Sequence, residues 1–297
     1  MADELRILER PELTRPVLVG AFRGWNDGAQ GASLAAGYLA KTWEAEKFAE
    51  IESENFFDFQ ATRPHVSLVD GVTRRIDWPE TSFYHARPRG SDRDVVLLLG
   101  IEPNLRWRTF TSLVVGLAKE LDTELVVTLG ALLADVPHTR PPPVTGSASN
   151  KELVEALGLS TSRYEGPTGI VGILHDACYR AELPSASLWA AVPHYVSLTP
   201  SPSAALALCQ RLGELIGVEI DTSELEEAGE SYVEQVSEAV ASDPETAAYV
   251  EELEQRADTI GESADIPSGD ALAAELTRFL RDRERENGGH EDAAHEQ

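Results

Sequence analysis

Residues 16–29 of this 297-residue chain read PVLVGAFRGWNDGA, and this stretch decides the fold. Its apolar part, residues 17–22, is short, continuous and followed by turn residues, which predicts a buried strand. The residues from Ala32 to Trp43 place small and apolar side chains on one face at helical spacing, and Asp27 is the expected N-cap of this helix. A strand, a tight turn and a helix in this order are typical of an α/β protein, in which the turn after a strand is where ligands or partners bind.

The glycines of the turn do not form a nucleotide-binding loop of a standard kind. Gly24, Gly28 and Gly31 fit neither the dinucleotide fingerprint nor the phosphate loop, which needs a Lys after its last glycine, and the first lysine of the chain is Lys41. We therefore interpret them as conformational residues that permit a tight turn and close helix packing, with direct phosphate contact as the less favoured alternative.

The charge of the chain is unevenly distributed. The net charge is −26, and residues 219–297 contain 24 Asp and Glu against five Arg and no Lys. We predict an α/β core at residues 1–218 and an acidic helical extension at 219–297, with a disordered tail from about residue 287. This balance argues against a nucleic-acid partner or an anionic membrane surface, because both require a positive face.

Composition also indicates the compartment. The chain has no apolar run long enough to cross a membrane and begins with an acidic segment, which predicts a cytoplasmic protein. Its two cysteines, Cys178 and Cys209, form neither a CxxC motif nor a Cys/His cluster, so we expect buried reduced thiols and no metal or cofactor.

The remaining pattern alternates strands and helices. Antiparallel strands are expected at 55–59, 66–69, 73–78 and 82–85, with a hairpin turn at Asp70-Gly71. Buried strands are expected at 95–99, 125–129 and 187–192, helices at 109–121, 170–182 and 203–216, and a long Pro-rich loop at 134–149. This order predicts a three-layer α/β/α fold with a mainly parallel central sheet and an antiparallel insertion.

The last third predicts helices only. Ser223 and Glu226 form a capping-box pattern, and Pro244 occupies the first position of a second helix. A third helix is expected at 270–285, with Leu272, Leu276, Phe279 and Leu280 on its apolar face, ending at Asn287-Gly288-Gly289. The apolar stripes of these helices require cover from the core, from each other or from another subunit.

Polar residues follow each predicted core strand, where an open α/β sheet binds its ligands. The candidate ligand- or partner-facing residues are Asn26, Asp27, Glu102, Arg106, His138, Arg140 and His194. If Arg106 and Arg140 share one cleft, their guanidinium groups suit a phosphate or carboxylate. The alternative is structural: Asp27 as a cap, Glu102 and Arg106 as a local ion pair, and the histidines bonded to loop backbone.

Known catalytic motifs are missing from the sequence. It contains no G-x-S-x-G elbow, no H-E-x-x-H and no metal-spaced histidine pair. These absences argue against an enzyme without excluding one, because acid and base residues can come from distant loops.

Several motifs in order resemble one family. They are residues 17–22 with Gly24-Trp25-Asn26-Asp27-Gly28-Ala29, Leu99-Gly100-Ile101-Glu102-Pro103 with Trp107, the segments 129–131, 137–141 and 166–170, and Trp189-Ala190-Ala191-Val192-Pro193-His194-Tyr195. Together, across about residues 15–216, they are similar to the proteasome assembly chaperone 2 family, in its actinobacterial branch. The resemblance implies a fold like that of purine nucleoside phosphorylases, self-association with a trimer as the expected state, and a relationship to proteins that assist proteasome assembly.

One departure from the family affects the functional expectation. Archaeal members resemble proteasome activators in ending with a hydrophobic residue, a Tyr and one further residue, whereas this sequence ends Ala294-His295-Glu296-Gln297. We therefore expect a self-associating assembly chaperone or scaffold with an unknown protein partner, proteasome subunits being one option. The alternative is a small-molecule enzyme or sensor that binds a nucleoside-like or phosphorylated ligand at the strand ends.

Overall fold

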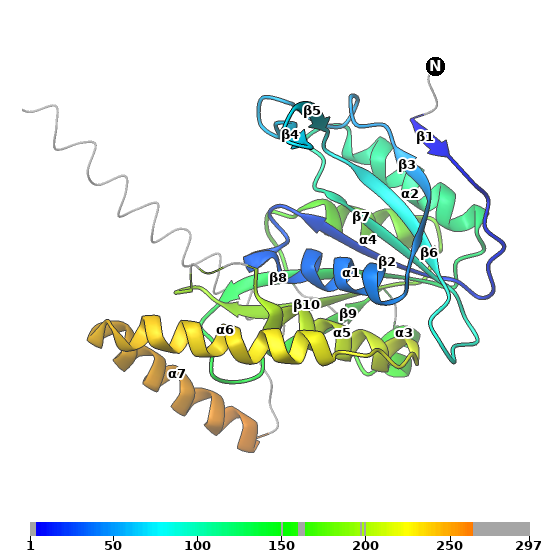
Figure 1. Cartoon of the computed structure of the whole chain (residues 1–297). Helices are drawn as coiled ribbons and strands as arrows, with labels where there is room; N and C mark the ends of the chain where they lie inside the picture. Colours follow the sequence, from blue (N-terminus) through cyan, green and yellow to red (C-terminus); the bar gives the residue numbers. More distant parts are fainter. Residues whose placement is uncertain (1–3, 150, 160–163, 197, 199, 264–297) are drawn as a thin grey trace, which may run out of the picture.

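The computed structural model describes residues 4–149, 151–159, 164–196, 198 and 200–263, and its centre is a mixed eight-stranded sheet (Figure 1). In spatial order the strands are β1 (Leu5–Ile7), β3 (Glu46–Ile51), β6 (Thr81–Ala86), β7 (Val95–Ile101), β2 (Val17–Arg23), β8 (Leu125–Ala134), β10 (Ser185–Pro193) and β9 (Val144–Ala148). Four neighbouring strands, β7, β2, β8 and β10, are parallel, and the strands outside them pair antiparallel.

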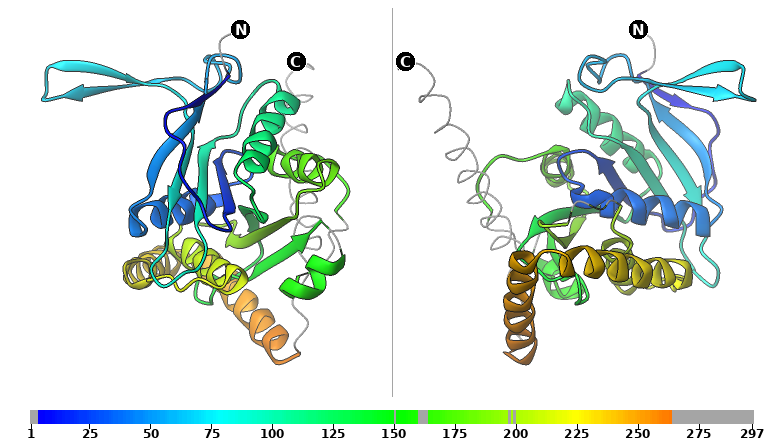
Figure 2. Two further views of the ribbon diagram at one scale, coloured as in Figure 1. Left: turned by 90° about the vertical axis from the view of Figure 1, so that its right-hand side faces the viewer. Right: turned by 60° about the vertical axis from the view of Figure 1, so that its left-hand side comes forward.

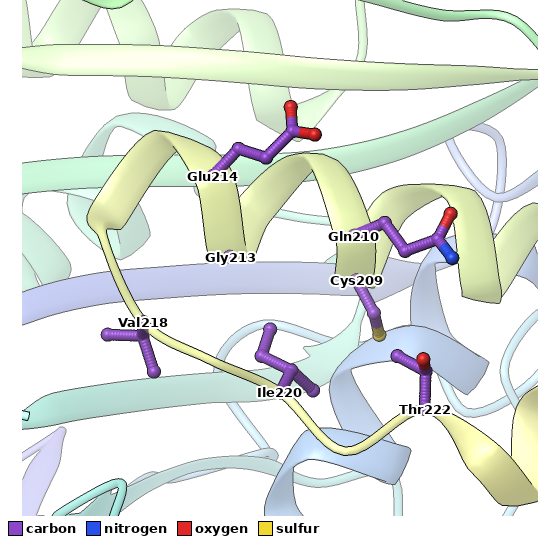
Figure 3. A pocket seen from close by; sticks show the side chains of 7 residues that line it. All are labelled: Cys209, Gln210, Gly213, Glu214, Val218, Ile220 and Thr222. Atoms are coloured by element: carbon purple, nitrogen blue, oxygen red, sulfur yellow. The ribbon is translucent and has the colours of Figure 1, made fainter. Parts of the chain in front are cut away.

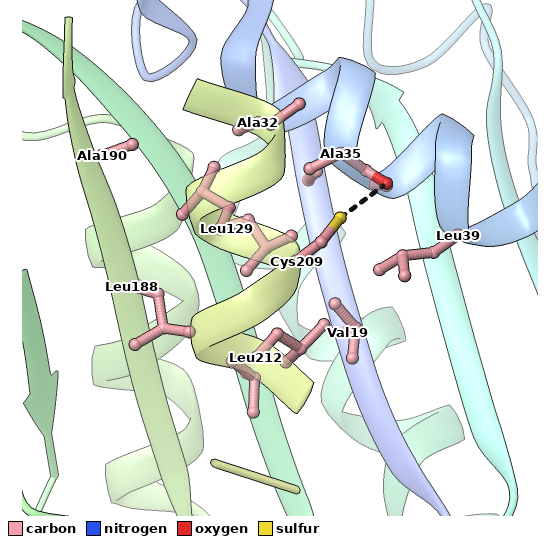
Figure 4. Close-up of a cluster of buried hydrophobic side chains, with 14 of the residues drawn as sticks. Val19, Ala32, Ala35, Leu39, Leu129, Leu188, Ala190, Cys209 and Leu212 are labelled. Carbon is pink, nitrogen blue, oxygen red and sulfur yellow. Dashed lines mark hydrogen bonds between the residues drawn. The ribbon is translucent and has the colours of Figure 1, made fainter. Parts of the chain in front are cut away.

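Helices cover both faces of the sheet. On one face lie α1 (Gly31–Thr42) and α5 (Pro202–Ile216), and on the other α2 (Trp107–Glu120) and α4 (Ile170–Arg180) (Figure 1). Alternating side chains of β2 separate two apolar cores: Val19 packs beneath α1 and α5 (Figure 4), and Leu18 packs beneath α2 and α4. The expected three-layer α/β/α fold is confirmed.

Two further helices lie outside this sandwich. The helix α6 (Ser223–Ala241) packs on α5, and α7 (Pro244–Ser263) continues from it at an angle (Figure 1). Leu225, Tyr232 and Val236 are the buried apolar side chains of α6. The sheet thus has an additional helical layer on the α5 side.

The expected strand at 55–59 is wrong. These residues form turns, in which the amide of Phe56 donates to the carbonyl of Ser53 and the carbonyl of Phe56 accepts from the amides of Asn104 and Leu105. Phe56 and Phe57 are buried, so the alternating pattern reflects a loop that anchors aromatic rings in the core.

The expected loop at 134–149 is also wrong in part. Residues 144–148 form β9, the edge strand beside β10. This strand is difficult to recognise in the sequence because it is short, lacks apolar alternation and follows a run of prolines. Prolines are nevertheless tolerated at the edge of a sheet, where β9 lies. The short strands β1 and β3 and the helix α3 (Lys151–Leu157) were likewise not expected.

Helix starts differ from the capping expectations by a few residues. The N-cap of α6 is Thr222, so Ser223 is its first helical residue and the predicted capping box is not formed. Pro244 does begin α7. The helix expected at 270–285, with its end at 287–289 and the tail beyond, lies outside the described residues.

The hairpin predicted around Asp70-Gly71 is confirmed. The strands β4 (His65–Val69) and β5 (Thr73–Asp77) pair only with each other and project from the body of the protein (Figure 2).

Candidate functional site

The carboxyl ends of the four parallel strands meet at one edge of the sheet, and the candidate residues lie in the turns that follow them. A short 3-10 turn, η1 (Gly28–Gln30), connects β2 to α1 at this edge. Whether the edge is open to a ligand depends on what the polar side chains of these turns contact.

Glu102 links three segments of this edge. Its Oε1 accepts hydrogen bonds from Nδ2 of Asn26 at 3.0 Å and from the amide of Ile170 at 2.8 Å, and its Oε2 accepts one from the amide of Trp25 at 3.3 Å. Ile170 is the first residue of α4, so the carboxylate of Glu102 occupies the helix N-terminus that would otherwise attract an anion. A side chain of this protein therefore fills the most favourable anion position near β7.

Two glycines allow this close approach. A Cβ atom at Gly169 would lie 2.3 Å from Nδ2 of Asn26 and 2.6 Å from Oε1 of Glu102, so a larger residue there would displace both of these hydrogen-bonded groups. Gly24 has a φ of +137°, and a Cβ atom there would lie 2.9 Å from Cβ of Glu102. The glycines of the turn serve conformation and packing, as the sequence indicated.

The side chain of Asp27 caps α1, although the η1 turn separates Asp27 from the first residue of the helix. Its Oδ1 accepts hydrogen bonds from the amides of Ala32 at 2.9 Å and Ser33 at 3.1 Å, across the intervening η1 turn. The residue formally at the N-cap position is Gln30, so the expectation was right about the chemistry and wrong about the position. Burial raises the pKa of Asp27, and its Oδ2 has no hydrogen-bond partner among the described residues.

Arg106 points to a different neighbour. It forms an ion pair with Glu4, and its guanidinium carbon lies 5.4 Å from the ring centroid of Phe56. The predicted ion pair between Glu102 and Arg106 is not among the ion pairs of the described residues.

His138 belongs to a second group at the ends of β8 and β10. Its Nδ1 lies 2.8 Å from Oη of Tyr195, and its Nε2 lies 3.0 Å from Oγ of Ser237 on α6. Burial lowers the pKa of His138, which favours the neutral ring. The imidazole therefore joins the strand-end loops to the outer helical layer.

Arg140 and His194 complete this connection. The guanidinium of Arg140 donates from Nε and Nη2 to the two oxygens of Asp258 at 2.8 and 2.9 Å, and from Nη1 to Glu254 at 3.3 Å, both on α7. Nδ1 of His194 lies 3.0 Å from Oδ1 of Asp135, the same atom that accepts a hydrogen bond from the hydroxyl of Tyr249. Arg140 thus binds carboxylates bidentately, as its fork geometry predicts, but the carboxylate is supplied by α7.

The structure separates the seven candidates into three places. Asn26, Asp27 and Glu102 lie together, His138, Arg140 and His194 lie together beneath α6 and α7, and Arg106 lies apart beside Glu4. The guanidinium groups of Arg106 and Arg140 contact different acidic residues, Glu4 and Asp258.

Sequence reasoning missed the tyrosines of the second group. The rings of Tyr195 and Tyr249 pack edge-on at a centroid distance of 6.1 Å, and both rings contact His194. Burial raises the pKa of Tyr195 to about 12, so its hydroxyl stays protonated. Tyr195 directly follows His194 and could have been selected, whereas nothing in the sequence links Tyr249 to this edge.

An open groove of about 390 Å³ lies elsewhere, between the second half of α5 and residues 218–222 (Figure 3). Cys209 lines it, but burial raises the pKa of this thiol to about 12, and its Sγ donates to the carbonyl of Ala35 at 3.9 Å (Figure 4). Cys178 is also buried with a thiol pKa raised to about 12, so both cysteines are buried and free of a disulfide, as expected, and burial disfavours their nucleophilic thiolate form.

The described ranges contain neither a metal-binding cluster nor a membrane-spanning helix. There, no three His, Cys, Asp or Glu side chains come together in a way that could hold a metal ion. Of the helices in that part of the chain, none combines the length and the apolar character required to cross a membrane.

Comparison with known proteins now identifies the family. The model of the PAC2 family matches residues 21–240, and the chain belongs to this family. A proteasome-assembly chaperone homologue from Mycobacterium tuberculosis is 46% identical, with 79% of this chain and 99% of that chain covered and a TM-score of 0.73. A PAC2 family protein from Streptomyces avermitilis is 48% identical, with the same coverage and TM-score. These actinobacterial neighbours confirm the resemblance found in the sequence.

More distant structures share the fold. A protein of unknown function from Mycobacterium tuberculosis is 27% identical, with 92% of this chain and 96% of that chain covered and a TM-score of 0.81. An archaeal proteasome activator from Pyrococcus furiosus is 19% identical with a TM-score of 0.64, which shows the fold alone. No curated protein matches the chain.

Proposed function

We propose that this protein acts through protein contacts, as an assembly chaperone or scaffold that self-associates in the cytoplasm. The observation that carries the proposal is the closure of the carboxyl edge of the sheet by the chain's own groups. Glu102 occupies the N-terminus of α4, and α7 supplies the carboxylates that Arg140 binds. An edge closed in this way favours a scaffold over the small-ligand alternative.

Family membership supports the same direction. A relative that is 46% identical is described as a proteasome-assembly chaperone homologue, which makes proteasome subunits the first partners to test. A trimer remains the expected oligomeric state, on the basis of the resemblance and the apolar stripes of the C-terminal helices.

The direct test uses separately purified α and β subunits of an actinobacterial proteasome. We expect the protein to bind one type of subunit, or to change the rate at which rings form, as measured by native gels and sizing chromatography. A mixture in which it neither binds a subunit nor alters assembly would remove the proteasome link.

The small-ligand alternative has its own measurement. Thermal shift with phosphate, nucleosides and nucleotides should show no stabilisation if the edge is closed. Stabilisation that is present in the natural protein and lost in Arg106→Ala or Arg140→Ala would instead favour the enzyme or sensor.

A further inference from the structure

The hairpin of β4 and β5 is the most exposed apolar feature among the described residues. We define the arm as residues 63–78, which contain both strands and the turn at Asp70 and Gly71, where φ is 51° and 73°. The arm is not part of the large sheet and extends away from the body in both views of Figure 2. A two-stranded hairpin is at best marginally stable alone in water, so an arm of this kind gains from a partner that covers it.

The strand register gives the arm two different faces. Val66 pairs with Ile76, and Leu68 pairs with Arg74, so these side chains share one face. Val66, Leu68 and Ile76 are 60%, 61% and 54% exposed, which makes this face an open apolar stripe. Trp78 follows Ile76 by two residues, is 53% exposed and packs edge-on against Phe59 at the base of the arm.

The opposite face is mostly polar, with Val69 as its one strongly apolar side chain, and its polar groups contact each other. Oγ of Ser67 donates to Oδ2 of Asp77 at 2.9 Å, and Nε of Arg75 donates to Oδ1 of the same residue at 2.7 Å. Val66, Leu68 and Ile76 have no such polar contacts among the described residues, so their face is the one that gains most from a partner.

Charge indicates which partner can approach this face. The chain carries a net charge of −26, whereas the arm contains three arginines against two aspartates. Arg63 and Arg74 form no ion pair with any described residue. Two copies of this protein repel each other over most of their surface, and the arm is a place where they can meet without bringing carboxylates together.

We propose that the apolar face of the arm stacks on the same face of the arm of a second copy, related by a two-fold axis. The inference rests on the proposed function, because it assigns a surface to the self-association proposed there. Two stacked hairpins bury their apolar faces as the sheets of a β-sandwich do, at about 10 Å separation. When the two arms run in opposite directions, Arg74 near the tip of one arm lies over Trp78 at the base of the other arm. This arrangement suits a cation–π contact.

The size of the arm sets the expected strength. A contact between two single hairpins lies at the low end of interface sizes, so association should depend on concentration in the micromolar range. A two-fold contact doubles the number of subunits in the assembly. If a trimer forms through another surface, pairing of its arms with those of a second trimer therefore produces a hexamer.

Cross-linking tests the faces directly. Val66→Cys and His65→Cys place a thiol on adjacent residues of β4 that face opposite ways, and both native thiols are buried. Val66 is level with Ile76, midway between Arg74 and Trp78, so the two copies of Val66 face each other in the proposed stack. With a short bis-maleimide we expect Val66→Cys to form cross-linked dimers and His65→Cys to remain uncross-linked. Equal cross-linking of the two variants, or none in either, would overturn the two-fold stack.

The molecular mass tests the energetics. Ile76→Glu places a carboxylate in the proposed contact, and Thr73→Glu places one on the polar face of the same strand as a matched control. By light scattering we expect Ile76→Glu to halve the mass at equal concentration, and Thr73→Glu to retain it. Circular dichroism should show both variants folded, because the arm lies outside the main sheet.

The outcomes separate this inference from the proposed function. An unchanged mass for Ile76→Glu, or a natural protein that is monomeric throughout the micromolar range, would overturn the arm contact. Neither result bears on binding to proteasome subunits, which the mixing experiment measures independently.

Discussion

Replacing Glu102 tests whether the edge of the sheet is built for stability or for a ligand. The carboxylate accepts hydrogen bonds from Asn26 and from the amide of Ile170 at 3.0 and 2.8 Å, with a longer bond to Trp25 at 3.3 Å. Asn26 is only 3% exposed, so Glu102→Ala would leave a buried amide and a helix N-terminus without their acceptor.

The magnitude follows from these contacts. Each of the two shorter bonds to a charged acceptor contributes about 1.5–3 kcal/mol, and partial solvent access to Glu102 reduces the sum, so we expect a loss of about 2–4 kcal/mol. For a chain of this size such a loss lowers the melting temperature by roughly 5–15 °C. Glu102→Gln retains one acceptor oxygen but places an N–H donor near the amide of Trp25, and should lose about 1 kcal/mol.

Thermal and urea unfolding measure the effect, with Glu120→Ala as the matched control. Glu120 is exposed and lies 3.6 Å from Arg10, so its loss should change stability by less than about 0.5 kcal/mol. If Glu102→Ala is as stable as the natural protein or more stable, Glu102 does not have the stabilising role inferred from its contacts, because groups held in place for function commonly reduce stability. That result would favour the small-ligand alternative, in which Glu102 contacts the ligand.

Three further predictions concern buried charge and the outer helices. His175 lies on α4, where its ring nitrogens contact the hydroxyls of Thr128 and Ser185. Burial lowers the pKa of His175 to about 4, so the native state resists protonation and the free energy of unfolding should fall by up to about 3 kcal/mol as the pH falls from about 6.5 to about 4. In urea unfolding, His175→Asn should remove that pH dependence, and an unchanged slope would contradict the assignment. Burial raises the pKa of Asp27, so the stability it contributes falls as pH rises through its native pKa, and Asp27→Asn should melt no lower than the natural protein at pH 8. A chain ending at residue 242 keeps the packing of α6 on α5 and should remain soluble. A chain ending at residue 218 exposes the surface of α5 that α6 covers, and should aggregate in sizing experiments. A soluble, cooperatively melting chain of 218 residues would instead support the domain boundary predicted there.

The central strands and their helices could be predicted from sequence because their signal is local. Residues 17–22 and 95–99 are continuous apolar runs, residues 125–129 are interrupted only by Thr128, and all three segments are largely buried on both faces of the sheet. The turn at Asp70-Gly71 was equally predictable, because both residues have positive φ, a conformation that Asp and Gly favour in hairpin turns.

The candidate site was predictable only in its location. The sequence places Glu102 at a strand end, but its main partner is the first amide of a helix that begins 68 residues later. In the same way, Arg140 and Asp258 are 118 residues apart, and no local pattern connects them. Single-residue signals identify polar groups at the edge, whereas their pairing depends on tertiary packing.

The positions of α6, α7 and the arm lead to a consequence for assembly. The six glutamates of α6 have no basic residue on the same helix, and the arm lies at the opposite side of the molecule from α7 (Figures 1 and 2). A two-fold contact through the arms therefore holds the acidic helices of the two copies apart, farther than the screening length of about 8 Å at physiological salt. Because the contact itself is apolar, association through the arm should depend only weakly on salt, whereas an interface through α6 and α7 would strengthen markedly as added salt screens their carboxylates.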